Sequence, residues 1–598
     1  MSLDKKTKFK TYLLIALPVV LFNLIAVFGI DVLLKDDAYR YYNVLNGDIF
    51  KFKYIHMLIG HITHGITFLI MSFSAELIRV IYLLFVMVPI SCLIYKLLHE
   101  KLGFPKIAAY TAAVLPNILP AQDEIPAFVN GTHVILGFLA VITCFFAIFK
   151  YLAAGAASAP QPIKPDDRAR NRKLLFFAVF LYFLATMMMD QPIFSLPVLV
   201  FAAAGYFKFE KKHMFLTGFL LMVAAHKAAW MMLMPRGSTS MAAPAASFIL
   251  ERAGRYFLAM LPVPTAGMPR EFKILTALFF VLIVVTGFFL HLRKGKKDPI
   301  FLPRPAFAHL SQPGFIFYIY GFLVTWVIGH IIVFATVSPR PFIVRYIYMA
   351  AFGLNALLVI SLYPILKKVL RNKNKFIYLV FIIVILSAGI SRFFQLHSYY
   401  SSVNRQQEKI VTKLKEIDPP QDAQVVVYLR GKAKNFWGVW KQSSGHLKHM
   451  MKRKDIDGLM GPGKVRYFNY YDAFNTKERG LNKKNRMRGL DLNRPLFLFA
   501  EKHDKLDQYE YALRWQRKEK DVLWTIFKLD KKNGGITALL SGQSRDEFRA
   551  AVKKLKQAGV ARSEICWAGQ PKYMDPKAWG GQPGKSGKET KSVPGNRL

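Results

Sequence analysis

Long runs of apolar residues alternate with short polar connections over the first two thirds of this chain of 598 residues. A run of about 20 apolar residues is long enough to cross a bilayer as an α-helix. Spans are predicted near residues 11–34, 76–98, 105–120, 132–152, 174–189, 192–207, 213–234, 272–292, 315–336, 345–367 and 375–397. The expected fold class is a polytopic α-helical membrane protein with about eleven transmembrane helices and a C-terminal soluble α/β domain.

The first apolar run, from Thr11 to Leu34, follows the basic segment KKTKFK. No small-x-small cleavage site closes it, so we expect a signal anchor that stays in the protein. Lys and Arg are more frequent in the connections that lie inside if the N-terminus is cytoplasmic. This bias predicts a multi-pass protein of the bacterial inner (cell) membrane, with a cytoplasmic N-terminus and an extracytoplasmic C-terminal domain.

The last third of the chain loses the long apolar runs and takes on strand and helix patterns. The segments AQVVVYLRG, RPLFLFA and KDVLWTIFKLD are typical of short strands. Ser544 is placed to cap a helix, and Gly559 is placed to end it. We expect a transmembrane domain over residues 1–400, a strongly basic extracytoplasmic α/β domain over 401–574 and a disordered tail, rich in Gly, Pro and Lys, over 575–598.

The composition narrows the class of protein and its partners. Hydrophobic residues make up 53% of the chain, which excludes an ordinary soluble protein of this size. The formal net charge is +45, and the C-terminal part is strongly basic. Such a surface suits membrane lipids, an anionic envelope polymer or an acidic protein, or it is solvated without a specific ligand. Nucleic acid is not an expected partner, because no nucleic-acid-binding motif is present.

An acidic pair, Asp36-Asp37, follows the first span and opens the loop KDDAYRYYNVLNGD. A carboxylate near a reacting hydroxyl can take its proton as a general base. Two adjacent acids can divide the work, one as the base and the other holding a metal or a substrate hydroxyl. The alternative is a solvated pair that ends a helix and carries no chemistry.

A second acidic pair, Asp123-Glu124, lies in the loop after the third predicted span. Pro120 and Pro126 flank it and predict a tight return to the membrane. Both pairs fall on the external side of the predicted topology. Together Asp36, Asp37 and Glu124 could bind a divalent metal or work as carboxylates alone, so the sequence leaves a metal cofactor open.

The tenth predicted span opens with the segment SPRPFIVRYIYMAAFG. Arg340 and Arg345 are placed at the external interface, where an arginine is a good bidentate ligand for a phosphate. The alternative is that each arginine extends to lipid headgroups. Tyr346 and Tyr348 follow at the depth where tyrosines commonly anchor a span. We take these four residues as candidates for substrate binding.

Other polar residues lie within or beside spans. His226 and Lys227 fall in the seventh span and His330 in the ninth, where each must face the bundle interior. A structural hydrogen bond is the expected role, although Lys227 could pair with a phosphate. His61 and His64 share one face of a predicted interfacial helix, but no carboxylate is spaced to complete a metal site with them. The three cysteines of the chain match no zinc or disulfide pattern.

The combined pattern resembles the GT-C superfamily of membrane glycosyltransferases. It looks most like the bacterial relatives of protein O-mannosyltransferases and of the transmembrane O-mannosyltransferases. In that group acids follow the first span, as Asp36-Asp37 does here. An acid follows a proline-bearing third span, as in LPNILPAQDEIPAFVNG, and a late span opens as in VRYIYMAAFG.

The resemblance covers roughly residues 1–400 and implies a polyprenyl-phosphate-linked sugar donor, inverting transfer and an external active site. By this likeness Asp37 or Asp36 is the base, Glu124 a second acid near donor or acceptor, and Arg345 a phosphate contact. The chain departs from the family at Asp190-Gln191-Pro192, where members often have a Lys-Glu pair.

That departure puts donor binding, and activity itself, in question. The alternatives to an enzyme are an inactive scaffold of this fold, organising a cell-envelope complex, and a transporter of lipid-linked glycans. A transporter should show internal repeats with matched broken helices and charges near mid-membrane, whereas the sequence shows no such repeat and its acids cluster at one rim of the membrane.

Overall fold

The computed structural model describes residues 3–28, 58–119, 132–156, 165–188, 193, 195–204, 211–233, 246–263, 268–294, 310–337, 348–371, 373–417, 424–429, 457–462, 496–500, 511–518, 521–529, 536–560 and 565–566. The chain divides into two compact units. The first holds Met1–Asp31 and Asn46–Ser402, and the second holds Val32–Leu45 and Val403–Leu598.

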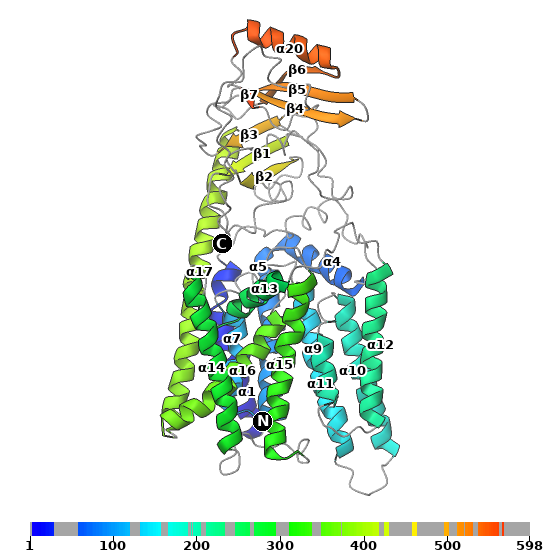
Figure 1. Ribbon diagram of the computed structural model, residues 1–598, viewed down its shortest axis with the longest axis vertical. Coiled ribbons are helices and arrows are strands. Elements are labelled where there is room, and N and C mark those ends of the chain that lie inside the picture. Colours follow the sequence, from blue (N-terminus) through cyan, green and yellow to red (C-terminus); the bar gives the residue numbers. More distant parts are fainter. Residues whose placement is uncertain are drawn as a thin grey trace. The chain divides into compact units, whose positions relative to one another are not determined.

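The first unit is built from helices, most of which run side by side (Figure 1). Their bounds are α1 Leu3–Leu21, α2 Leu24–Phe28, α4 Leu58–Phe73, α5 Ala75–Tyr82, α6 Val88–Lys96, α7 Lys106–Ile118, α9 Thr132–Ala156, α10 Pro165–Met188, α11 Leu196–Ala204, α12 Lys211–Leu233, α13 Ala246–Ala259, α14 Arg270–Lys294, α15 Gln312–Val337, α16 Tyr348–Val369 and α17 Asn374–Ile417. Two π-helical turns, Leu83–Met87 and Leu97–Lys101, continue α5 and α6.

Six described helices are long and apolar enough to cross a membrane, so the protein has the character of a polytopic membrane protein. They are Glu76–Lys101, Ala169–Met188, Arg270–Arg293, Gln312–Ile331, Tyr348–Val369 and Asn374–Ser398. Three shorter apolar helices, Phe9–Leu21, Ile135–Tyr151 and Met214–Ala229, overlap further predicted spans. The predicted total of eleven spans is not established.

Two predicted spans differ from the helices that the structure shows. The run near 11–34 is not one helix, because α1 ends at Leu21 and α2 begins at Leu24. The last span, expected near 375–397, belongs to a helix of 44 residues that continues to Ile417. The helix continues through the polar residues after position 397, so the apolar run predicts the part of the helix that can cross a membrane but not where the helix ends.

Burial separates the central helices from the peripheral ones. In the apolar window of α16, 78% of the residues are buried, against 11% in α14. Helix α7 is also central, since almost all its side chains from Ile107 to Ile118 are buried. The exposed large apolar residues of α14 are those expected to face lipid tails.

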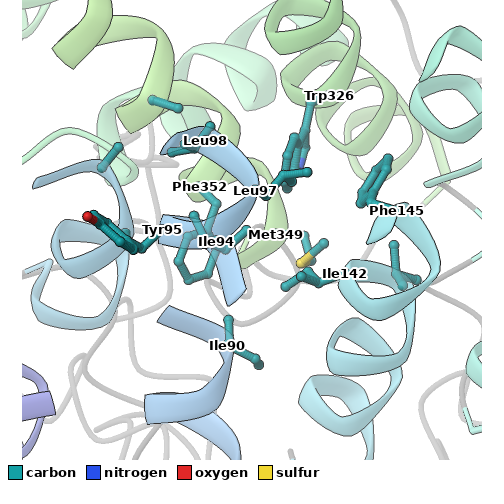
Figure 2. Packing of buried hydrophobic residues seen from close by; sticks show 14 of the residues in the cluster. Ile90, Ile94, Tyr95, Leu97, Leu98, Ile142, Phe145, Trp326, Met349 and Phe352 are labelled. Atoms are coloured by element: carbon teal, nitrogen blue, oxygen red, sulfur yellow. The ribbon is translucent and has the colours of Figure 1, made fainter. Parts of the chain in front are cut away.

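The core of the first unit joins α6, α9, α15 and α16. Figure 2 shows Ile90 and Ile94 of α6 beside Met349 and Phe352 of α16, with Phe145 of α9 facing Trp326 of α15. The rings of Phe145 and Trp326 lie 5.3 Å apart between centroids. Close approach also requires glycine. A Cβ on Gly287 of α14 would overlap the backbone of Ser361 in α16.

The second unit contains two sheets in its described part. Strands β1 Gln424–Leu429, β2 Asp457–Pro462 and β3 Leu496–Ala500 pair in parallel, in the order β2-β1-β3. Strands β4 Tyr511–Lys518, β5 Asp521–Leu529, β6 Ile536–Gly542 and β7 Ile565–Cys566 form the second sheet, in the order β6-β5-β4-β7.

Helix α20, Arg545–Gln557, follows β6 and begins as the sequence predicts. Ser544 accepts a hydrogen bond from the backbone N–H of Glu547, whose side chain accepts one from the backbone of Ser544 in return. This capping box satisfies amide groups that the first turn of a helix leaves open. Gly559 follows the helix with a φ of 81°, a left-handed conformation that glycine adopts without strain.

Candidate functional site

Some of the predicted site residues lie among the residues that the structure describes, and others do not. Seven of them lie outside the described residues, and these are Asp36, Asp37, Asp123, Glu124, Arg340, Arg345 and Tyr346. Tyr348 and Lys227 lie inside them. What the structure does define is one buried set of hydrogen bonds that joins three helix ends near those segments, namely the break between α1 and α2, the end of α7 and the start of α16.

The first of these ends is the break between α1 and α2. Pro18 interrupts the hydrogen-bond ladder of α1, and the chain turns at Phe22 and Asn23 before α2 begins. Asn23 is fully buried, and its Nδ2 donates to the carbonyl of Val19 at 2.6 Å and to the carbonyl of Asn117 at 3.0 Å. The amide thus satisfies its donors on two different helices. It ties the start of α2 to the end of α7.

The second end is the last turn of α7, where Asn117 follows Pro116. The Nδ2 of Asn117 donates to the hydroxyl of Ser91 in α6 at 2.6 Å. The Oδ1 of Asn117 accepts a hydrogen bond from the hydroxyl of Tyr348, the first residue of α16. All three side chains are buried. Asn117 therefore joins α6, α7 and the third end, which is the start of α16.

Arg392 of α17 completes the arrangement and is itself fully buried. Its Nε and Nη2 donate to the Oδ1 of Asn23 at 3.2 and 2.8 Å, and its Nη1 donates to the carbonyl of Leu119. A guanidinium inside a membrane bundle is costly, and it persists only with such partners. We call Asn23, Ser91, Asn117, Tyr348 and Arg392, with the carbonyl of Leu119, the Arg392 network.

Arg392, Asn23 and Asn117 were not among the residues predicted from the sequence. One signal was present, because an arginine inside the apolar run of residues 375–397 must face the bundle interior. A second buried arginine, Arg79 of α5, was missed in the same way. Its Nη1 lies 3.5 Å from the carbonyl of Val27 in α2, so it too contacts the segment that leads toward Asp36.

Tyr348 and Lys227 are buried, with 0% and 1% of their surfaces exposed. The hydroxyl of Tyr348 is used inside the Arg392 network, so the geometry gives this residue a role in fixing helix ends. Lys227 lies on α12, which packs against α10 and α11. Its neighbour His226 is exposed and contacts the ring of Phe183 at 6.0 Å between centroids.

His330 makes the structural hydrogen bonds that the sequence analysis expected. Its Nδ1 lies 2.8 Å from the carbonyl of Trp326, and its Nε2 lies 3.1 Å from the hydroxyl of Ser195. Because a carbonyl only accepts, Nδ1 carries the proton and Nε2 accepts from Ser195. This pair joins α15 to the start of α11.

Within the described part of the chain, no group of three or more His, Cys, Asp or Glu residues could hold a metal ion. The acids considered for a divalent metal, Asp36, Asp37 and Glu124, lie outside that part, so a metal there stays a prediction. Cys144 is buried and its thiol donates to the carbonyl of Ala178 at 3.1 Å. Its contact is structural.

The solved structures that resemble this chain at a distance include those of the oligosaccharyltransferase from the archaeon Archaeoglobus fulgidus. The apo form of the oligosaccharyltransferase of Archaeoglobus fulgidus matches with a TM-score of 0.41 and 16% identity, covering 80% of this chain and 68% of that one. The same enzyme tethered to an acceptor peptide matches with a TM-score of 0.39 and 16% identity, covering 79% and 67%. Its complex with an inhibitory peptide and a dolichol-phosphate gives 0.40 and 13%, covering 77% and 65%.

This chain thus spans about two thirds of the length of the oligosaccharyltransferase, and similarity at this level is coarse. No protein-family model matches the sequence. No curated protein matches it either. The resemblance to O-mannosyltransferases therefore stays a prediction from the sequence.

Proposed function

We propose that this protein is a membrane glycosyltransferase that moves a sugar from a polyprenyl-phosphate-linked donor to an extracytoplasmic acceptor. The observation that supports the proposal is the Arg392 network. The segments that carry the predicted acids and arginines follow α2, follow α7 and precede α16. The network joins the turn before α2, the end of α7 and the start of α16 by direct hydrogen bonds.

Each residue has a role in the proposed reaction. Asp36 or Asp37 takes the proton of the acceptor hydroxyl as the sugar arrives, which is general-base catalysis. Glu124 lies near donor or acceptor as a second acid. Arg345 binds the lipid phosphate through its planar pair of donors. Lys227 is a further candidate for binding that phosphate. Supporting contacts to the substrate are proposed for Asp123, Arg340 and Tyr346. Tyr348, predicted from the sequence as a further substrate contact, donates its buried hydroxyl to Asn117, so its proposed role is to hold the start of α16.

The basic C-terminal region is proposed to lie outside the membrane and to bind an anionic envelope polymer or acidic protein. Helix α20 illustrates the charge, since Arg549, Lys553, Lys554 and Lys556 are all exposed. Phe548, Ala551 and Leu555 form its buried face. The charged side chains are thereby left to face solvent or a partner.

The experiment is a turnover assay on the full chain in nanodiscs with a panel of polyprenyl-phosphate sugars. We expect release of the lipid phosphate by the wild type and its loss in Asp36→Asn/Asp37→Asn, with thermal stability retained. Asp546→Asn is a matched control, because that carboxylate is 90% exposed on α20. Wild-type turnover in the Asp36/Asp37 variant would refute the assignment of the base. Donor binding without turnover would favour the inactive scaffold.

A further inference from the structure

We propose that Arg392 is a positioning residue, which makes the turn between α1 and α2, the end of α7 and the start of α16 move as one unit. This inference rests on the proposed function for its catalytic meaning, because the segments with the predicted site residues follow α2, follow α7 and precede α16. Its structural content stands on the described contacts alone.

The contacts form one continuous chain across helices that are far apart in sequence. Arg392 reaches Asn23 over a separation of 369 residues and Leu119 over 273. Asn23 reaches Asn117 over 94 residues, and Tyr348 reaches the same Asn117 over 231. Every side chain in it is buried. A displacement of one helix end therefore breaks a buried hydrogen bond to another.

The geometry explains why the residue is arginine. A guanidinium presents several donors in a rigid plane, so Arg392 bonds the side chain of Asn23 and the backbone of Leu119 at once. A lysine has the same charge but donates from a single nitrogen, so it lacks the planar fork by which Arg392 bonds the two acceptors from separate nitrogens. Arg392→Lys therefore separates the effect of the fork from the effect of the charge.

Ser91, which contacts Asn117 and lies at the far side of the network from Arg392, offers a mild variant. Ser91→Ala removes the hydroxyl that accepts from Asn117 and leaves all proposed site residues in place. Ser361→Ala is the matched control, because Ser361 is equally buried and its hydroxyl pairs with Tyr320 at 3.0 Å, outside the network. The two substitutions remove the same group from the same kind of environment.

The test is amide hydrogen exchange on the full chain in nanodiscs without substrate. We expect Arg392→Lys and Ser91→Ala to accelerate exchange roughly three- to tenfold at residues 24–28, 115–119 and 348–352 together, as the loss of one or two buried hydrogen bonds implies. Ser361→Ala should leave exchange at 24–28 and 115–119 unchanged. Acceleration at only one of the three ends, or in none, would overturn the coupling.

Turnover then tests the catalytic meaning separately. We expect both network variants to lower kcat with little change in the KM for the donor lipid, while Ser361→Ala retains the wild-type kcat. Faster exchange with unchanged kcat would overturn the positioning role. Faster exchange in a protein whose wild type turns over no donor would support the coupling and refute the proposed function instead.

Discussion

The strongest prediction concerns the interaction between Arg392 and Asn23, measured by a double-mutant cycle. The single variants are Arg392→Met, which keeps an unbranched apolar side chain, and Asn23→Leu, which keeps the approximate volume of the amide. Arg392→Met removes three hydrogen bonds and strands two buried acceptors, the Oδ1 of Asn23 and the carbonyl of Leu119.

Two estimates bound the loss of stability in Arg392→Met. Hydrogen bonds between membrane helices contribute about 0.6 kcal/mol each on average, so three give about 2 kcal/mol. Each stranded buried acceptor costs about 1–3 kcal/mol, so two give up to about 6 kcal/mol. We expect a decrease in the free energy of unfolding within this range. The double variant should be less destabilised than the sum of the single ones, by about 1–2 kcal/mol, because it removes donor and acceptor together.

The assay is reversible unfolding of the four proteins in mixed micelles, followed by tryptophan fluorescence. If the losses of unfolding free energy in the two single variants sum to the loss in the double variant within about 0.5 kcal/mol, the reasoning is refuted, because residues that do not interact behave additively. A second cycle between Arg392 and Tyr320 serves as control. Tyr320 contacts Ser361 and lies outside the network, so that cycle should be additive.

Two further predictions test the packing and the capping described above. Gly287→Ala should lower the unfolding free energy by about 1–3 kcal/mol, because the added Cβ meets the backbone of Ser361. Gly218→Ala is the control, since no atom lies within 4 Å of its added Cβ, and it should stay within about 0.5 kcal/mol of wild type or gain stability. Equal effects of the two substitutions in an unfolding titration would contradict this packing. Ser544→Ala should destabilise α20 by about 1 kcal/mol and accelerate its amide exchange about fivefold, and unchanged exchange at residues 545–549 would show that the capping box contributes little.

The sequence predicts the long helices of the first unit because the thickness of a bilayer fixes the length of an apolar run. It is less informative for helices whose role depends on position in the bundle. Helix α7 has 13 residues and is almost entirely buried, although its composition resembles that of a lipid-facing span. Apolarity is the same toward lipid and toward protein, so it cannot say which helix is central. The Pro18 and Asn23 break was likewise hidden inside a continuous apolar run.

The candidate site was predictable only in part, and the reason is the range of the interactions. Asp36, Glu124 and Arg345 are conspicuous in the sequence because they are charged beside apolar runs, and they stay predictions. Arg392 is just as unusual, since it lies within a run. Its meaning depends on Asn23 and Leu119, which are hundreds of residues away. No local pattern encodes such partners.

Stability alone does not account for a fully buried arginine in α17. Burying a guanidinium in a membrane bundle costs several kcal/mol before its hydrogen bonds are counted, and apolar side chains in place of Arg392 and all its partners would pack without that cost. What the arginine adds is a fixed geometry, because one rigid group on α17 holds the turn after α1 and the carbonyl of Leu119, just past α7, at set distances. One acidic segment follows the short helix α2 that begins at this turn, and the other follows α7. The position therefore makes most sense as a means of fixing where those segments begin.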